Sequence, residues 1–168
     1  TMFRLCLFFI TVLLACPVSP TNATTLTDSG EGLIITCGPT VAGFGQNNIQ
    51  STILAAFKKA RYLELPLVLS KDNQPVVFDD IYLDPHTDVV EHYPERARED
   101  GHYYVIDFTL AELKGLQLKH PADSTYLYLS GFEEQLALVR KLEKELERVI
   151  GIYPKLIKTW FHSLEGQD

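Results

Sequence analysis

Residues 62–78 read YLELPLVLSKDNQPVVF and carry the clearest signal for the architecture of this chain. Residues 62–69 form an almost continuous apolar run, which predicts a buried strand. Residues 71–74 supply the polar side chains of a turn, and residues 75–78 read as a further strand directly after it. A sheet with at least one fully buried strand therefore lies at the centre of the predicted fold.

Strands and helices alternate on both sides of this stretch. Asn47 or Asn48 can cap the first predicted helix, and Thr109 with Glu112 forms a capping box for a later one. Gly151 is the expected end of the last long helix. The predicted strands are 33–35, 62–69, 75–78, 103–108 and 152–157, and the predicted helices are 49–60, 94–99, 109–116 and 132–149. This order predicts an α/β fold with a parallel sheet, about the N-terminal half of a (β/α)8 TIM barrel, which takes ~250 residues.

Composition and charge narrow the possible partners. Of the 168 residues, 46% are hydrophobic and 22% charged, as in a globular domain with a packed core. The formal net charge of −7 argues against nucleic acid and against an anionic membrane surface, since both need a basic patch. Cys37 is the one cysteine outside the N-terminal segment, so no intrachain disulfide framework is expected in the folded body.

The N-terminal residues have the pattern of an export signal. Residues 5–15 form an apolar run that is too short for a membrane span, which needs ~20 residues, but that fits a signal peptide. We therefore expect a signal peptide at 1–16, a polar linker at 17–31 and a folded domain at 32–168.

Residues 13–16, LLAC, resemble a bacterial lipobox, in which Cys16 would be lipidated. Plain signal cleavage further on, for instance after Ala23, is the alternative. Either way the expected location is outside the cytoplasm, as a periplasmic protein or an outer-membrane lipoprotein. Contact with a membrane is expected only through a lipid anchor at Cys16.

Four segments carry a resemblance to a known family. They are YLELPLVLSKDNQPVVFDDIYLDPHTDV (62–89), HYPERAREDGHYYVIDFTLAELKGL (92–116), GFEEQLALV (131–139) and IGIYPKLIKTWFHSLEGQD (150–168). Together they closely resemble the periplasmic glycerophosphodiester phosphodiesterases. The resemblance implies a TIM barrel that hydrolyses glycerophosphodiesters, such as glycerophosphocholine, to glycerol 3-phosphate and an alcohol with a divalent metal, Ca or Mg. Family members continue well past the position that corresponds to Asp168.

The resemblance also implies the catalytic and substrate-binding positions, most of which are substituted. Cys37 and Asp79 stand where the family has its two catalytic histidines. Gly38 replaces the arginine that binds phosphate, and Gln46 replaces a glutamate. Asp80, in contrast, is unchanged. Losing a general acid or base costs roughly 10²- to 10⁴-fold in rate, so hydrolysis is expected to be impaired.

The metal-binding positions implied by the resemblance are altered in the same way. Glu64 keeps one of three carboxylates, whereas Pro66 and Lys155 replace the other two, and Ile157 replaces a nearby lysine. A hard divalent cation needs several oxygen ligands, and Lys155 would bring a positive charge to the metal position. Lys155 could instead pair with Glu64, or its ammonium could bind a phosphate group without metal.

Three hypotheses follow from these substitutions. The first is a non-catalytic, exported family member that keeps the scaffold and weak binding of a glycerophosphodiester or phosphate ligand. The second is an active enzyme with rearranged chemistry, using Glu64, Asp80 and Cys37. The third is a truncated remnant, of which a homodimer completing one barrel from two halves is a variant.

Overall fold

The computed structural model describes residues 25–28, 31–37, 48–119 and 127–167, with side chains described only in the last two ranges. The expected signal peptide and Cys16 lie outside these ranges, as do Gly38 and Gln46. Of Cys37, the backbone alone is described. Among the residues that are described, no helix is both long and apolar enough to cross a bilayer.

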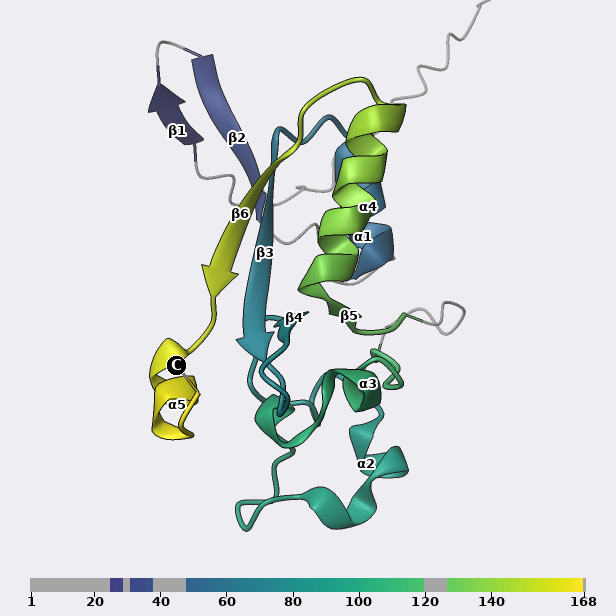
Figure 1. Ribbon diagram of the computed structural model, residues 1–168, viewed down its shortest axis with the longest axis vertical. Helices are drawn as coiled ribbons and strands as arrows, with labels where there is room; N and C mark the ends of the chain where they lie inside the picture. Colours follow the sequence, from purple (N-terminus) through teal and green to yellow (C-terminus); the bar gives the residue numbers. More distant parts are fainter. Residues whose placement is uncertain (1–24, 29–30, 38–47, 120–126, 168) are drawn as a thin grey trace, which may run out of the picture.

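Strand β3 (Tyr62–Leu69) is the centre of a six-stranded sheet (Figure 1). β2 (Glu31–Cys37) and β6 (Gly151–Leu156) both pair with β3 in parallel, one on each side. The predictions of strands at 33–35 and 152–157 and of a buried strand at 62–69 are therefore confirmed. This parallel arrangement is the α/β pattern that the alternation of elements predicted.

The other three strands are antiparallel additions to this parallel group. β1 (Thr25–Asp28), within the segment expected to be linker, pairs with β2. β4 (Pro75–Val77) folds back along the end of β3, and β5 (Ser130–Gly131) pairs with β4. A short turn can join only antiparallel neighbours, because a parallel crossover needs a dozen or more residues. The strand at 75–78 is thus a hairpin arm and not a further barrel strand.

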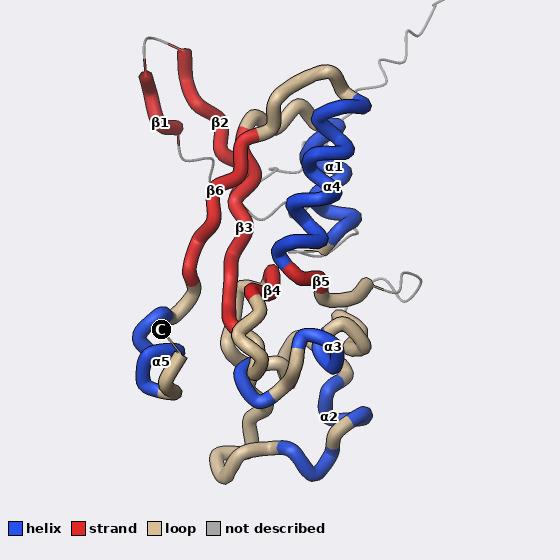
Figure 2. The backbone as a smooth tube through the Cα atoms, viewed as in Figure 1, coloured by secondary structure: helices blue, strands red, loops and turns tan. Residues whose placement is uncertain are grey.

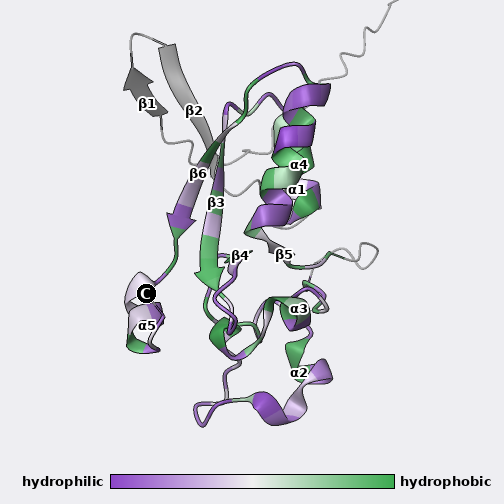
Figure 3. Cartoon of the chain, viewed as in Figure 1, coloured by the Kyte–Doolittle hydropathy of each residue, from purple (hydrophilic) through white to green (hydrophobic). Residues whose placement is uncertain are grey.

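Two helices cover one face of the sheet, α1 (Ile49–Phe57) and α4 (Phe132–Glu145) (Figure 2). Leu63 of β3 is buried against their apolar residues, which shows that this face of β3 points to the helices. Hydrophilic and hydrophobic residues alternate along α4 in Figure 3. The solvated charged face predicted here is confirmed only in part: Lys141, Lys144, Glu145 and Glu147 are exposed, whereas Glu143 and Arg148 are half-buried and bond the backbone. The buried residues of this layer are Ala55, Ala56, Ala60, Leu63, Val139, Leu142 and Ile150.

Two of the predicted helix ends are confirmed and one is wrong. Asn48 caps α1 through its side chain, and Thr109 and Glu112 form the predicted capping box of α3 (Leu110–Leu113). The prediction that Gly151 ends the long helix is wrong, because α4 stops at Glu145 and Gly151 begins β6.

A second cluster of short elements packs beyond the carboxyl end of β3. It contains α2 (Val89–His92), the 3₁₀ turns η1 (Pro94–Arg96) and η2 (Val105–Asp107), and α3. The strand predicted at 103–108 is wrong: only a single bridge, Tyr82 to Tyr104, forms before η2 begins. These apolar residues are buried in a core around Phe108 instead, which explains their strand-like hydrophobicity.

Candidate functional site

The candidate site begins on the face of β3 and β6 that α1 and α4 do not cover. Successive side chains of a strand point to opposite faces, so Glu64 points away from the helices that bury Leu63. Glu64 is in register with Cys37 of β2 on one side and with Tyr153 of β6 on the other. The backbone therefore brings the Cys37 position and Glu64 side by side.

Lys155 meets Glu64 on this uncovered face. Its Nζ lies 3.3 Å from Oε1 of Glu64, and the two side chains are 55% and 14% exposed respectively. Pro66 is the register partner of Lys155 and adds no polar group to the pair. The expected alternative in which Lys155 forms an ion pair with Glu64 is therefore confirmed.

Asp80 follows β4 and is bound by a second lysine. Lys158 Nζ donates to Oδ1 of Asp80 at 2.9 Å, and His86 Nε2 lies 3.5 Å from Oδ2. Burial alone would raise the pKa of Asp80, but the hydrogen bonds from Lys158 and from the Ile81 amide outweigh it and hold the pKa below its usual value. Asp80 is thus an ionised carboxylate whose charge is compensated from within the chain.

Lys158 is held in place by more than its contact with Asp80. It lies between β6 and α5 (Thr159–Leu164) with a positive φ of 45°, a conformation that is uncommon for a residue with a side chain. Its ammonium also lies 5.1 Å from the centre of the Tyr82 ring, within the range of a cation–π contact. Its contacts with Asp80 and with the Tyr82 ring add Lys158 to the site.

The carboxylates of this face do not fit a divalent metal. Calcium takes six to eight oxygen ligands and magnesium near-octahedral geometry, whereas Glu64 and Asp80 are each engaged by a lysine. Asp79, next to Asp80, is exposed. Within residues 48–119 and 127–167, no group of three His, Cys, Asp or Glu side chains gathers to hold a metal ion.

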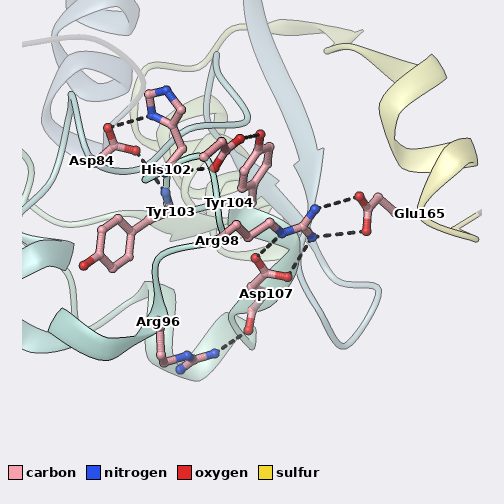
Figure 4. Close-up of polar contacts among 9 residues, drawn as sticks. Asp84, Arg96, Arg98, His102, Tyr103, Tyr104, Asp107 and Glu165 are labelled. Atoms are coloured by element: carbon pink, nitrogen blue, oxygen red, sulfur yellow. Dashed lines mark hydrogen bonds and ion pairs between the residues drawn. The ribbon is translucent and has the colours of Figure 1, made fainter.

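A polar network around Arg98 and His102 lies beside the site (Figure 4). Arg98 donates to both oxygens of Asp107, at 2.7 and 2.8 Å, and to both oxygens of Glu165, which follows α5. Its guanidinium also lies over the Tyr104 ring at 4.3 Å, and the two carboxylates raise the pKa of Arg98 above its usual value. Arg98 therefore joins α5 to the cluster of short elements.

His102 belongs to the same network and is oriented by a carboxylate. Its Nδ1 lies 3.1 Å from Oδ2 of Asp84, whose other oxygen accepts the Tyr103 amide (Figure 4). Its ring contacts that of Tyr82, with the two centres 4.6 Å apart. The carboxylate of Asp84 and the Tyr82 ring together fix the orientation of the His102 ring.

Sequence reasoning missed Lys158 and His86 as partners of Asp80. Neither residue lies at ligand spacing or in a motif, and Lys158 is 78 residues from Asp80 in the sequence. The sequence did offer one signal for Lys158, which is its position just after the end of β6. Barrel proteins place their active-site loops at the carboxyl ends of the parallel strands.

Solved structures share the α/β fold of this chain over less than half of their own length. A glycerophosphodiester phosphodiesterase from Agrobacterium tumefaciens superposes with a TM-score of 0.55 at 21% identity, covering 73% of this chain and 46% of that one. An Oleispira antarctica phosphodiesterase in complex with the product sn-glycerol-3-phosphate gives the same score at 22% identity, covering 73% and 43%. At this identity the likeness shows the fold, which is the TIM-type architecture predicted from the sequence.

The chain belongs to the glycerophosphoryl diester phosphodiesterase family, whose model matches residues 39–168. It is 30% identical to a Haemophilus influenzae glycerophosphodiester phosphodiesterase over 94% of this chain and 48% of that protein. It is 39% identical to one from Treponema pallidum over 73% of this chain and 39% of that protein. The chain thus spans half or less of the length of these relatives.

Proposed function

We propose that this chain is a family member that does not carry out metal-dependent hydrolysis of glycerophosphodiesters. The observation that carries the proposal is the ion pair of Lys155 and Glu64, with 3.3 Å between Nζ and Oε1. In the family resemblance Glu64 is the one metal carboxylate that remains, and here a cation of the chain itself neutralises it. Any metal would have to displace an ammonium group and then find further oxygen ligands.

The second kept acid supports the same proposal. Asp80 is bound by Lys158 as Glu64 is bound by Lys155, and both lysines come from the end of β6 and the residues just after it. Two positions that would otherwise add negative charge are neutralised by one short segment. We infer that the protein retains at most weak binding of a glycerophosphodiester or a phosphate group on this face.

The test measures release of glycerol 3-phosphate from glycerophosphocholine with millimolar calcium or magnesium. We expect no release above that of a Glu64→Ala variant, and a melting curve that the metals leave unchanged. A Pro66→Asp/Lys155→Glu double variant should gain metal-dependent thermal stabilisation, while Lys155→Met should not. Metal-dependent release by the unaltered chain above the Glu64→Ala control would overturn the proposal.

One observation favours a second candidate, an active phosphodiesterase with rearranged chemistry. Cys37 is the register neighbour of Glu64, so a thiol and a carboxylate originate side by side on adjacent parallel strands. A thiol serves as a base or nucleophile only as the thiolate, which needs a lowered pKa. This candidate requires that Cys37→Ser abolish release of glycerol 3-phosphate, whereas the favoured proposal expects no activity to lose.

We also propose that the chain is exported, on the basis of the apolar run at 5–15 and the polar residues after it. Mass spectrometry of the protein recovered from cells tests this. Export predicts a mature N-terminus at a lipidated Cys16 or after Ala23, and an intact N-terminal segment in a cytoplasmic fraction would contradict it.

A further inference from the structure

The charge of this chain is distributed unevenly over the fold. Residues 79–119, beyond the carboxyl end of β3, carry ten acidic and four basic side chains. Residues 57–61 and 144–150 together carry two acidic and five basic ones. Figure 1 shows these two segments at the end of the molecule away from α2 and α3. The net charge of −7 therefore does not rule out a local basic surface, and we call residues 57–61 and 144–150 the base.

The two segments of the base are bonded to each other, so their side chains belong to one surface. The Arg148 guanidinium donates to the carbonyl groups of Ala56 and Ala60, the latter at 2.7 Å. The Gly151 amide donates to the Arg61 carbonyl at 2.8 Å. Both segments are connections between described elements, α1 to β3 and α4 to β6, and they meet at the amino ends of the two strands.

Two lysines of the base, Lys58 and Lys59, are exposed. Among the side chains that the structure describes, neither has an ion-pair partner. The nearby Glu143 accepts a backbone amide at 2.8 Å, whereas Glu145 and Glu147 are exposed. Lys58 and Lys59 can therefore bind anionic groups from outside the chain.

Two large apolar side chains of the base are exposed as well. Phe57 is the last residue of α1 and is 62% exposed, and Val149 is 84% exposed. Single exposed apolar residues are normal, but these two come from different connections that meet at one end of the fold. Apolar side chains flanked by lysines are typical of surfaces that bind at the boundary between lipid headgroups and acyl chains.

We propose that the base is a docking surface for a membrane that contains anionic phospholipids. The lysines bind lipid phosphates, and Phe57 and Val149 enter the headgroup region beside them. The eight residues of β3 separate the acidic segment 79–119 from the base by about 25 Å, more than twice the distance over which salt screens charges. The part of the candidate site around Asp80 then faces away from the membrane. The proposal goes beyond the proposed function and depends neither on hydrolysis nor on a lipid anchor.

A lipid surface fits the base better than a protein partner does. A stable protein–protein interface takes about 20–30 residues from each side, whereas the base consists of 12. A lipid surface adapts to the side chains that enter it and needs no matching contour. Its negative charge also complements the unpaired lysines.

Quenching of tryptophan fluorescence by brominated lipids tests the proposal on the full chain. A Phe57→Trp/Trp160→Phe variant carries its only tryptophan at the base, because the unaltered chain has a single tryptophan. With vesicles of phosphatidylglycerol and phosphatidylcholine we expect a blue shift and quenching, and with phosphatidylcholine alone neither. High salt should remove both effects. The signal reports contact of the base itself, so attachment of the apolar run at 5–15 to a vesicle does not reproduce it.

In the same background, Lys58→Glu/Lys59→Glu should raise the lipid concentration for half-maximal quenching roughly thirtyfold or more, since each lysine contributes about fivefold. Lys114→Glu/Lys119→Glu is the matched control, because it changes the net charge equally at the other end of the molecule and should leave quenching unchanged. Circular dichroism should be the same for all variants.

Trp160 of the unaltered chain is the second control, since it lies on α5 and should not be quenched. No quenching at position 57 with the mixed vesicles overturns the proposal. Equal quenching with phosphatidylcholine alone, or equal quenching of Trp160, overturns it as well, because the contact would then depend neither on lipid charge nor on the base.

Discussion

Gly151 and Tyr62 face each other across the pairing of β3 and β6, and the glycine leaves room for the tyrosine ring. A Cβ atom at position 151 would lie 2.3 Å from two carbons of that ring, well inside van der Waals contact. Gly151→Ala therefore has to move Tyr62, and we expect a loss of about 1–3 kcal/mol in the free energy of unfolding. Denaturant titration followed by circular dichroism measures it.

The control is the same substitution in a Tyr62→Ala background. Without the ring the added methyl meets no obstacle, so the second loss should be clearly smaller and the double-mutant cycle should give a nonzero coupling energy. Equal losses in the two backgrounds would show that the cost comes from elsewhere. Tyr62 is only partly buried, so its ring can move outward. We therefore expect the loss in the free energy of unfolding for Gly151→Ala to lie toward the lower end of this range.

Helix α3 depends on its capping box for stability. The Thr109 hydroxyl accepts the Glu112 amide at 3.3 Å, and Glu112 returns the bond by accepting the Thr109 amide at 2.8 Å. Thr109→Ala should destabilise the protein by about 0.5–2 kcal/mol, since the Glu112 amide loses its partner. Thermal or chemical unfolding measures the loss, and Thr109→Ser should retain most of the stability. A serine variant as unstable as the alanine variant would point to the lost methyl group instead.

The elements that the sequence predicted correctly are those whose signals are local. The strand over 62–69 rests on its own hydrophobic run, and the caps at Asn48 and Thr109 rest on bonds within three residues. Residues 103–108 misled the prediction, because burial in a core of short elements gives the same hydrophobicity as burial in a sheet. Gly151 misled it for a related reason: the glycine is required by a tyrosine 89 positions earlier, and not by the helix before it.

Arg98 holds α5 against the cluster of short elements and so joins two distant parts of the fold. It binds Asp107 and Glu165 with a planar fork that a lysine ammonium does not reproduce. We expect Arg98→Lys to cost roughly 1–2 kcal/mol, since its partners are about one-third exposed, and to speed hydrogen exchange in α5 more than in α4. Lys114→Ala is the control, because its pair with Glu134 is more exposed and should contribute little.

The candidate site could be predicted only in part, because some of its contacts join residues that are distant in the sequence. The identities at Cys37, Glu64, Asp79, Asp80 and Lys155 indicated an altered site, and the pairing of Lys155 with Glu64 was one of the expected alternatives. The binding of Asp80 by Lys158 and His86 depends on how three loops meet beyond the strand ends. No periodicity or motif in the sequence indicates that these loops lie together.

The contact between Arg98 and Glu165 can form only after the chain between the two residues has folded back on itself. The two residues are 67 positions apart, so the contact closes a long loop and becomes favourable only after the entropy of closure has been lost. During synthesis the short elements around Phe108 emerge before β6 and α5 exist. Their last restraint therefore arrives late, and we expect pulsed hydrogen exchange to show complete protection of residues 94–107 no earlier than that of α5.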